Sequence, residues 1–219
     1  MADIAAQDVK ALRDATGAGM MDAKRALVEA DGDHEAAAQA LREKGLAKAA
    51  GRSDRDNTEG AIGLAATIDR ASLVHLRCET DFSAKSDGFV SLVDELASAV
   101  LEEGETALEA RTATLDDLRL STKENCEVGR VALVEAAAGN LVDTYLHRQD
   151  GRGVNGVVVE ASGVDQETLH QIALHIAFAK PTALSRDEVP PNLVEAERAA
   201  LLDITKAEGK PEQAWDKIV

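Results

Sequence analysis

Apolar residues recur at intervals of three and four through the first 45 residues of the chain, which predicts short helices. A first helix near Ile4–Asp14 stops before the glycines of Thr16–Gly19, and Asp33 is placed to cap a third helix. The residues expected to face inward are Val9 and Leu12 in the first helix, Met20, Ala23, Leu27 and Ala30 in the second, and Ala36, Ala37, Ala40 and Leu41 in the third. A module so close to the lower size limit for folding usually exists to present a surface.

A period of two replaces the helical period after a polar linker that runs from Gly51 to Glu59. Ala61–Ile68 and Ser72–Glu79 are predicted strands joined by a short turn, so an antiparallel hairpin is expected. Residues 86–103 return to a helical pattern. The inward face of that helix is predicted to consist of Phe89, Leu92, Val93, Leu96 and Val100.

The same order of elements then recurs. Arg130–Glu135 and Leu141–Leu146 are expected to form a second hairpin, Gly156–Ala161 a third strand, and Gln166–Ala179 a helix. The inward residues of this helix are predicted to be Leu169, Ile172, Ala173 and Ile176. Two hairpin-then-helix units indicate two related α+β halves packed into one core.

The last segment has the pattern of an antiparallel helical hairpin. Asn192–Glu208 is a charged helix with a narrow apolar seam, and Glu212–Val219 begins a return helix of about two turns. The seam consists of Leu193, Ala196, Ala200 and Ile204. So short a return helix cannot cover the seam, so we expect the exposed residues, Leu201 included, to be mobile or paired with a second copy of the chain in a homodimer.

The predicted fold class is therefore α+β, with a three-helix module, a two-half core that contains antiparallel β-hairpins, and a helical hairpin. The predicted divisions are residues 1–50 for the module, 51–59 for the linker, 60–120 and 121–180 for the two halves of the core, and 181–219 for the hairpin, which we expect to be truncated.

Charge and composition limit the kinds of partner. The net charge is −16 and the pI is near 4.7, so the surface repels phosphate backbones and direct binding to nucleic acid is not expected. No run of about 18 apolar residues occurs, so no contact with a membrane is expected. Cys78 and Cys126 imply no disulfide framework, and the N-terminus lacks the apolar run of a secretory signal. The expected location is the cytoplasm.

The sequence contains no recognisable constellation for chemistry on a small molecule. Thr16–Gly19 follows a predicted helix and lacks the third glycine of a dinucleotide site, so a tight turn between helices is expected. The histidines show no ligand spacing for a metal, and Cys78 lies in a strand, where a buried and inert thiol is the default. We therefore expect no cofactor, no metal and no catalytic residue, and an enzyme is the least favoured class.

Two features favour a protein contact instead. Phe82 falls in the connection after a predicted strand, in the segment Cys78–Lys85, and connections carry function more often than core elements do. Packing of Phe82 back onto the core is an equally weighted alternative. In the N-terminal module, at least one of Met20 and Met21 must face outward beside Lys24, where methionine supplies adaptable contact area.

Taken together, these segments resemble the elongation factor Ts family over the whole chain. The specific motifs are Thr16–Leu27 and Cys78–Phe82, and the weaker ones are Tyr145–His147, His170–His175 with Lys180–Pro181, and Glu208–Pro211. The resemblance implies a guanine nucleotide exchange factor of translation that binds elongation factor Tu, both GDP-bound and nucleotide-free, and performs no chemical catalysis. It also implies that the N-terminal three helices resemble ubiquitin-associated domains and dock on the nucleotide-binding domain of the partner.

The same resemblance assigns roles to individual residues. Asp81 and Phe82, which follow Thr80, are expected to wedge between partner helices near the magnesium site, and His147 to make a further contact with the partner. The docking face of the module is predicted to consist of Lys10, Arg13, Met20, Met21 and Lys24. The competing interpretation is a protein-interaction adaptor with a ubiquitin-associated-like module and no exchange activity.

The chain departs from the family in two places near the predicted wedge. Ser83 occupies a position that is often apolar in the family, so the residue either eases exposure of the wedge or weakens its attachment. A longer family motif is reduced here to Lys123–Asn125, which puts the contact of that loop in question.

Overall fold

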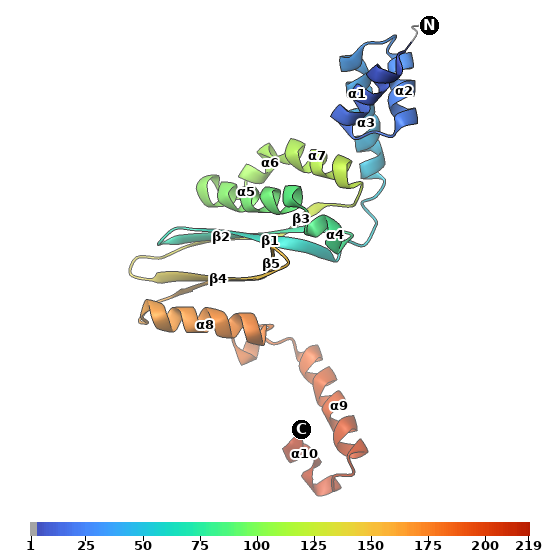
Figure 1. Cartoon of the computed structure of the whole chain (residues 1–219). Helices are drawn as coiled ribbons and strands as arrows, with labels where there is room; N and C mark the ends of the chain where they lie inside the picture. The colour runs from blue at the N-terminus through green and yellow to red at the C-terminus, as the bar shows by residue number, and fades with distance from the viewer. Residues whose placement is uncertain (1–3) are drawn as a thin grey trace. The chain divides into compact units, whose positions relative to one another are not determined.

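The computed structural model describes residues 4–219. The chain separates into a larger compact unit, which ends at Ala177, and a smaller unit, Phe178–Val219. Each unit is described here by itself. Within the larger unit, residues 4–50 form a helical module and the remainder forms an α+β core (Figure 1).

The helical module consists of α1 (Ala6–Thr16), α2 (Met20–Glu29) and α3 (His34–Ala50). The predicted cap of the third helix is confirmed, because the Asp33 carboxylate accepts hydrogen bonds from the backbone N–H groups of Glu35 and Ala36. The module has an apolar cluster of its own, which contains Val9, Leu12, Ala23, Ala26, Leu27 and Ala37. The first helix begins and ends two residues later than the pattern predicted.

Three residues predicted to face inward do not. Met20 is half exposed, since it is the first residue of α2, where the chain has only just left the glycine turn. Ala36 and Ala40 of α3 are exposed, whereas Ala37 is buried and Ala38 packs beside it. The apolar face of α3 is therefore rotated by about one residue from the predicted one. An alanine-rich helix has small apolar residues on several faces, so its sequence pattern identifies the buried face poorly.

The core contains a three-stranded antiparallel sheet in the order β1 (Glu59–Ala66), β2 (Arg70–Cys78) and β3 (Glu127–Glu135). The predicted first hairpin, β1 with β2, is confirmed. A single helical turn, α4 (Asp81–Ala84), links β2 to α5 (Asp87–Glu103). Helix α5, together with α6 (Ala107–Ala110) and α7 (Thr112–Thr122), lies over one face of this sheet (Figure 1).

The main apolar core lies between α5 and this sheet. All the predicted inward residues of α5 are buried, namely Phe89, Leu92, Val93, Leu96 and Val100. Gly63 of β1 permits this close approach, because a Cβ atom at that position would lie 2.2 Å from the carbonyl oxygen of Val93. The hydroxyl of buried Ser72 donates a hydrogen bond of 2.6 Å to the carbonyl oxygen of Ala97, which fastens β2 to the helix.

A two-stranded sheet of β4 (Leu141–Gln149) and β5 (Arg152–Ala161) covers the other face of the first sheet (Figure 1). The predicted pairing of Arg130–Glu135 with Leu141–Leu146 is wrong, because β3 pairs with β2 and β4 pairs with β5. The turn of the actual hairpin is Asp150–Gly151, and both residues have positive φ angles of 51° and 81°. Such a turn matches the twist of antiparallel strands and closes a tight hairpin.

Helix α8 (Gln166–Ala179) has the predicted bounds and packs on the second sheet. Its buried residues, Leu169, Ala173 and Ala177, include two predicted ones, and Ile176 is partly buried. Ile172 is 40% exposed, so its predicted inward position is wrong. The inward stripe follows Leu169, Ala173 and Ala177 at steps of four, which leaves Ile172 at the margin of that face.

The smaller unit contains the predicted helical hairpin. A turn, η1 (Arg186–Glu188), leads into α9 (Pro191–Ala207), and the chain returns through η2 (Glu212–Ala214) and α10 (Trp215–Ile218). Within this unit the indole N–H of Trp215 donates to the carbonyl oxygen of Lys210, at 2.8 Å. The apolar seam of α9 is exposed, and Leu193, Leu201 and Ile204 are 47%, 38% and 54% exposed.

Candidate functional site

The turn between β2 and α5 presents Phe82 to solvent. Buried Cys78 ends the strand, and the Thr80 hydroxyl caps α4 by accepting from the backbone N–H of Ser83, at 3.3 Å. Ala84 of the same turn is fully buried, whereas the Phe82 side chain is 83% exposed. The alternative that Phe82 packs onto the core is therefore wrong.

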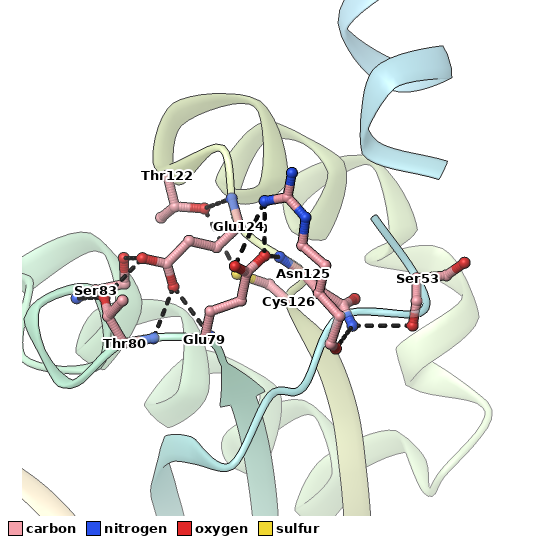
Figure 2. A network of polar contacts seen from close by, with 9 residues as sticks. Ser53, Glu79, Thr80, Ser83, Thr122, Glu124, Asn125 and Cys126 are labelled. Atoms are coloured by element: carbon pink, nitrogen blue, oxygen red, sulfur yellow. Dashed lines mark hydrogen bonds and ion pairs between the residues drawn. The ribbon is translucent and has the colours of Figure 1, made fainter. Parts of the chain in front are cut away.

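The Glu124 carboxylate lies behind this turn and accepts four hydrogen bonds from it (Figure 2). One oxygen accepts from the backbone N–H groups of Glu79 and Thr80, at 3.0 and 3.1 Å. The other accepts from the hydroxyls of Thr80 and Ser83, at 2.6 and 2.7 Å. Ser83 therefore contributes to the attachment of the turn, which is the opposite of the weakened anchoring considered from the sequence.

The protonation state of Glu124 follows from these contacts. Burial on its own would raise the pKa of this carboxyl group, but the hydrogen bonds from Thr80, Ser83 and the backbone of Glu79 outweigh it. The pKa of Glu124 is therefore held below its ordinary value, and the group is a charged acceptor at neutral pH.

The neighbouring residue Asn125 joins the same cluster to the linker (Figure 2). Its side-chain amide donates to the carbonyl oxygens of Ser53 and Arg55, at 3.1 and 2.8 Å. Its backbone N–H donates to the Glu79 carboxylate, at 2.7 Å. Lys123–Asn125 therefore contacts both the turn that carries Phe82 and the segment that leads from the helical module.

A second set of contacts joins the Phe82 turn to the β4–β5 hairpin. The Lys85 ammonium group lies 2.8 Å from the Asp81 carboxylate and 3.2 Å from that of Asp150, in the turn of the hairpin. The hydrogen bond from Lys85 lowers the pKa of Asp81. His147 precedes this turn on β4, is exposed, and lies 3.3 Å from the Tyr145 hydroxyl through its Nδ1 atom. The contacts of Lys85 thus connect the two segments that carry Asp81 and His147.

The predicted docking residues of the helical module are all exposed. Met20 and Met21 are 50% and 75% exposed at the start of α2, and Lys24 follows one turn later. Lys10 and Arg13 lie on α1, and Arg13 makes a long ion pair of 3.7 Å with Asp14. That these five residues form a single docking face stays a prediction.

The described residues hold little that favours chemistry. Burial raises the pKa of Cys78 to about 12, so its thiol is protonated, and it donates to the carbonyl oxygen of Thr80. Among residues 4–219 no three His, Cys, Asp or Glu side chains gather as a metal site would require, and no helix there could cross a bilayer.

Residues 79–219 match the protein family described as elongation factor TS. Over its full length the chain is 45% identical to the elongation factor Ts of Clavibacter michiganensis, of which it covers 83%. With 99% of its length it is 43% identical to elongation factor Ts of Cutibacterium acnes and of Ruegeria sp., and it covers 82% and 77% of those proteins.

These similarities place the chain among the translation elongation factors. Within that class it belongs to the elongation factor Ts family.

Proposed function

We propose that this protein binds elongation factor Tu and promotes the release of GDP by disturbing the magnesium and phosphate site of that partner. The observation that carries the proposal is the exposure of Phe82, at 83%, on a turn fastened from behind by hydrogen bonds. Aromatic side chains that enter a pocket at the centre of an interface commonly supply much of the binding energy. A solvent-facing phenylalanine on a turn held by hydrogen bonds fits that role.

Differential binding provides the mechanism. The exchange factor stabilises the nucleotide-free partner more than the GDP-bound partner, and the difference sets how far the equilibrium shifts. By reciprocity, GDP or GTP weakens the complex by the same factor. In this proposal Phe82 moves the groups around the ion, and Asp81 accompanies it as a second contact. No bond of the nucleotide is made or broken.

Other parts of the chain add contacts in this proposal. His147 touches the partner from the β4–β5 hairpin, whose turn the Lys85 ion pairs join to the Phe82 segment. The helical module docks on the nucleotide-binding domain of the partner, where methionines supply adaptable area and the cations meet acidic groups. The proposed docking face consists of Lys10, Arg13, Met20, Met21 and Lys24.

The proposed working units keep the divisions expected from the sequence. Residues 1–50 dock, 51–59 link, 60–120 and 121–180 form the halves of the core, and 181–219 form the hairpin, through which two copies of the chain can pair. We place the activity in the cytoplasm, where elongation takes place in bacteria, with elongation factor Tu as the partner and no direct contact with nucleic acid.

Release of labelled GDP from elongation factor Tu tests this proposal. We expect a small molar fraction of this protein to accelerate release, with the recovered nucleotide still GDP. A binding assay on the same samples separates the alternatives. Binding without acceleration would favour the protein-interaction adaptor, and neither binding nor acceleration would reject both.

A further inference from the structure

We propose that Glu124 is a positioning residue, whose carboxylate fixes the Thr80–Ser83 turn so that Phe82 is presented in the orientation that exchange requires; this inference rests on the proposed function. Glu124 is the acceptor for four donors of that turn and its flank, two backbone N–H groups and two hydroxyls. None of these contacts involves Phe82 itself, so Glu124 acts on Phe82 through the neighbouring residues Thr80 and Ser83.

Besides the Glu124 contacts, the turn is held by the Thr80 cap on Ser83, by the hydrogen bond of Lys85 to Asp81 and by contacts of α4 with β1 and β2. Helix α4 has only four residues, and a single helical turn is not stable by itself because nucleation is costly. Of its residues only Ala84 is buried, and its small side chain adds little packing. The Phe82 side chain is 83% exposed, so packing does little to define the direction of its ring. The orientation of Phe82 therefore depends on the hydrogen bonds that fix the backbone beneath it.

A carboxylate suits this role better than a neutral residue of the same reach. The Thr80 hydroxyl donates to Glu124 and accepts from the N–H of Ser83, so both of its functions are used. Charge also strengthens each hydrogen bond that Glu124 accepts. Glutamine can keep the pattern in part, because its oxygen can accept from the two N–H groups while its amide donates to the two hydroxyls.

The substitutions Glu124→Ala, Glu124→Gln and Ser83→Ala form a graded series. Glu124→Ala removes all four hydrogen bonds, Glu124→Gln removes the charge and reverses the bonds to the two hydroxyls, and Ser83→Ala removes one hydrogen bond. Ser72→Ala is the control for loss of stability, since it removes a buried hydrogen bond to Ala97 and touches nothing in the turn. Each variant is made in the full chain and checked for its thermal transition before use.

Two measurements apply to the whole series. The first is hydrogen exchange at the amides of Glu79, Thr80 and Ser83, which needs no partner. The second is the rate of labelled GDP release from elongation factor Tu at saturating factor, together with the factor concentration that gives half of that rate.

For Glu124→Ala we expect the three amides to exchange at least ten-fold faster, and the saturating rate to fall at least ten-fold, which corresponds to about 1.4 kcal/mol. For Glu124→Gln we expect the amide exchange and the saturating rate to stay within about three-fold of those of the natural chain, because glutamine keeps part of the hydrogen-bond pattern and so loses less than the roughly 1.4 kcal/mol that a factor of ten requires. Ser83→Ala should fall between these variants. Ser72→Ala should lower the thermal transition and leave the turn amides and the saturating rate unchanged.

The inference would be overturned if folded Glu124→Ala released GDP at the same saturating rate as the natural chain. It would also be overturned if Glu124→Gln lost as much of that rate as Glu124→Ala, or if Ser72→Ala showed the same loss. If Glu124→Ala does not fold, Ser83→Ala decides, since natural amide exchange in that variant would contradict the inference. If the natural chain fails to accelerate GDP release, the proposed function fails. The positioning of the turn is then judged on amide exchange alone, where acceleration in the variants supports it and its absence overturns it.

Discussion

The ammonium nitrogen of Lys85 lies 3.2 Å from a carboxylate oxygen of Asp150, so the short helix after β2 is joined to the turn of the β4–β5 hairpin. The same nitrogen lies 2.8 Å from Asp81. One lysine therefore links the residue that precedes Phe82 to the hairpin that carries His147. Lys85 and Asp81 are only partly buried and Asp150 is exposed, so these ion pairs stabilise the fold weakly and are sensitive to salt. Their main effect is to lower the pKa of Asp81.

Replacing Lys85 should change the titration of Asp81. The hydrogen bond and charge of Lys85 lower the pKa of Asp81, so in Lys85→Met that pKa should rise toward its ordinary value of 3.8. Titration of the carboxyl carbons by NMR measures the shift. Asp165 is the matched control, because the N–H and hydroxyl of Thr168, rather than Lys85, lower its pKa. An unmoved Asp81 would mean that the ion pair is absent in solution.

The acid sensitivity of the fold should depend in part on Glu124. The pKa of Glu124 is lower in the folded protein than its ordinary value of 4.5. A depressed pKa gives stability that is fully present above the unfolded pKa and is lost as the pH falls through the folded pKa. Between pH 6 and pH 3 the natural chain should therefore lose more unfolding free energy than Glu124→Gln. Urea unfolding at each pH measures this difference, and parallel curves would contradict it.

Removing the helical module should weaken binding and leave the core folded. The module has its own apolar cluster, and it meets the core where α3 contacts α7 and Arg42 forms an ion pair with Asp117. A chain that begins at residue 51 should remain soluble and bind elongation factor Tu much more weakly, because it lacks the proposed docking face. Titration calorimetry with both chains tests this. Equal affinities would rule out a docking role for the module.

The exposed seam of α9 should respond to protein concentration. Leu193, Leu201 and Ile204 present apolar area that nothing within the smaller unit covers. In dilute solution we expect rapid amide exchange in α9, and at high concentration slower exchange together with a larger mass by light scattering. A monomer whose α9 amides are protected at every concentration would show that the seam is covered in another way.

The comparison with the sequence shows which features a pattern can reveal. The helical period of residues 86–103 was predicted correctly, because large apolar side chains mark one face of α5. The bounds of α8 were also predicted correctly, but its inward face was predicted only in part, since Ile172 is 40% exposed and two of the buried residues are alanines. The pairing of β3 was predicted wrongly, since alternation identifies a strand and says little about its neighbour. Asp150–Gly151 was the available signal, as this dipeptide favours the hairpin turn that joins β4 to β5.

The candidate site was predictable only in part. Phe82 stood out from the sequence as a rare aromatic residue in a connection, and its exposure is confirmed. Glu124 and Lys85 did not stand out, because their roles depend on residues that are distant in the sequence. Glu124 contacts Thr80, which lies 44 residues earlier, and Lys85 contacts Asp150 in the turn between β4 and β5. Long-range hydrogen bonds leave no local period, so no window of sequence reveals them.

The central claim is that Phe82 drives nucleotide release, and the substitution Phe82→Ala tests it most directly. Because Phe82 is 83% exposed, its loss should leave thermal stability nearly unchanged, within the roughly 0.5 kcal/mol typical of surface positions. Phe178→Ala is the matched control, since it deletes an equally exposed phenylalanine, at 87%, outside the turn.

The decisive measurement is the rate of labelled GDP release from elongation factor Tu at saturating concentrations of each chain. Truncation of an aromatic anchor costs about 2 kcal/mol, which corresponds to a rate roughly thirty-fold lower. We therefore predict that Phe82→Ala releases GDP about thirty-fold more slowly than the natural chain, while Phe178→Ala matches the natural chain. A folded Phe82→Ala protein that accelerates release as well as the natural chain would contradict the account.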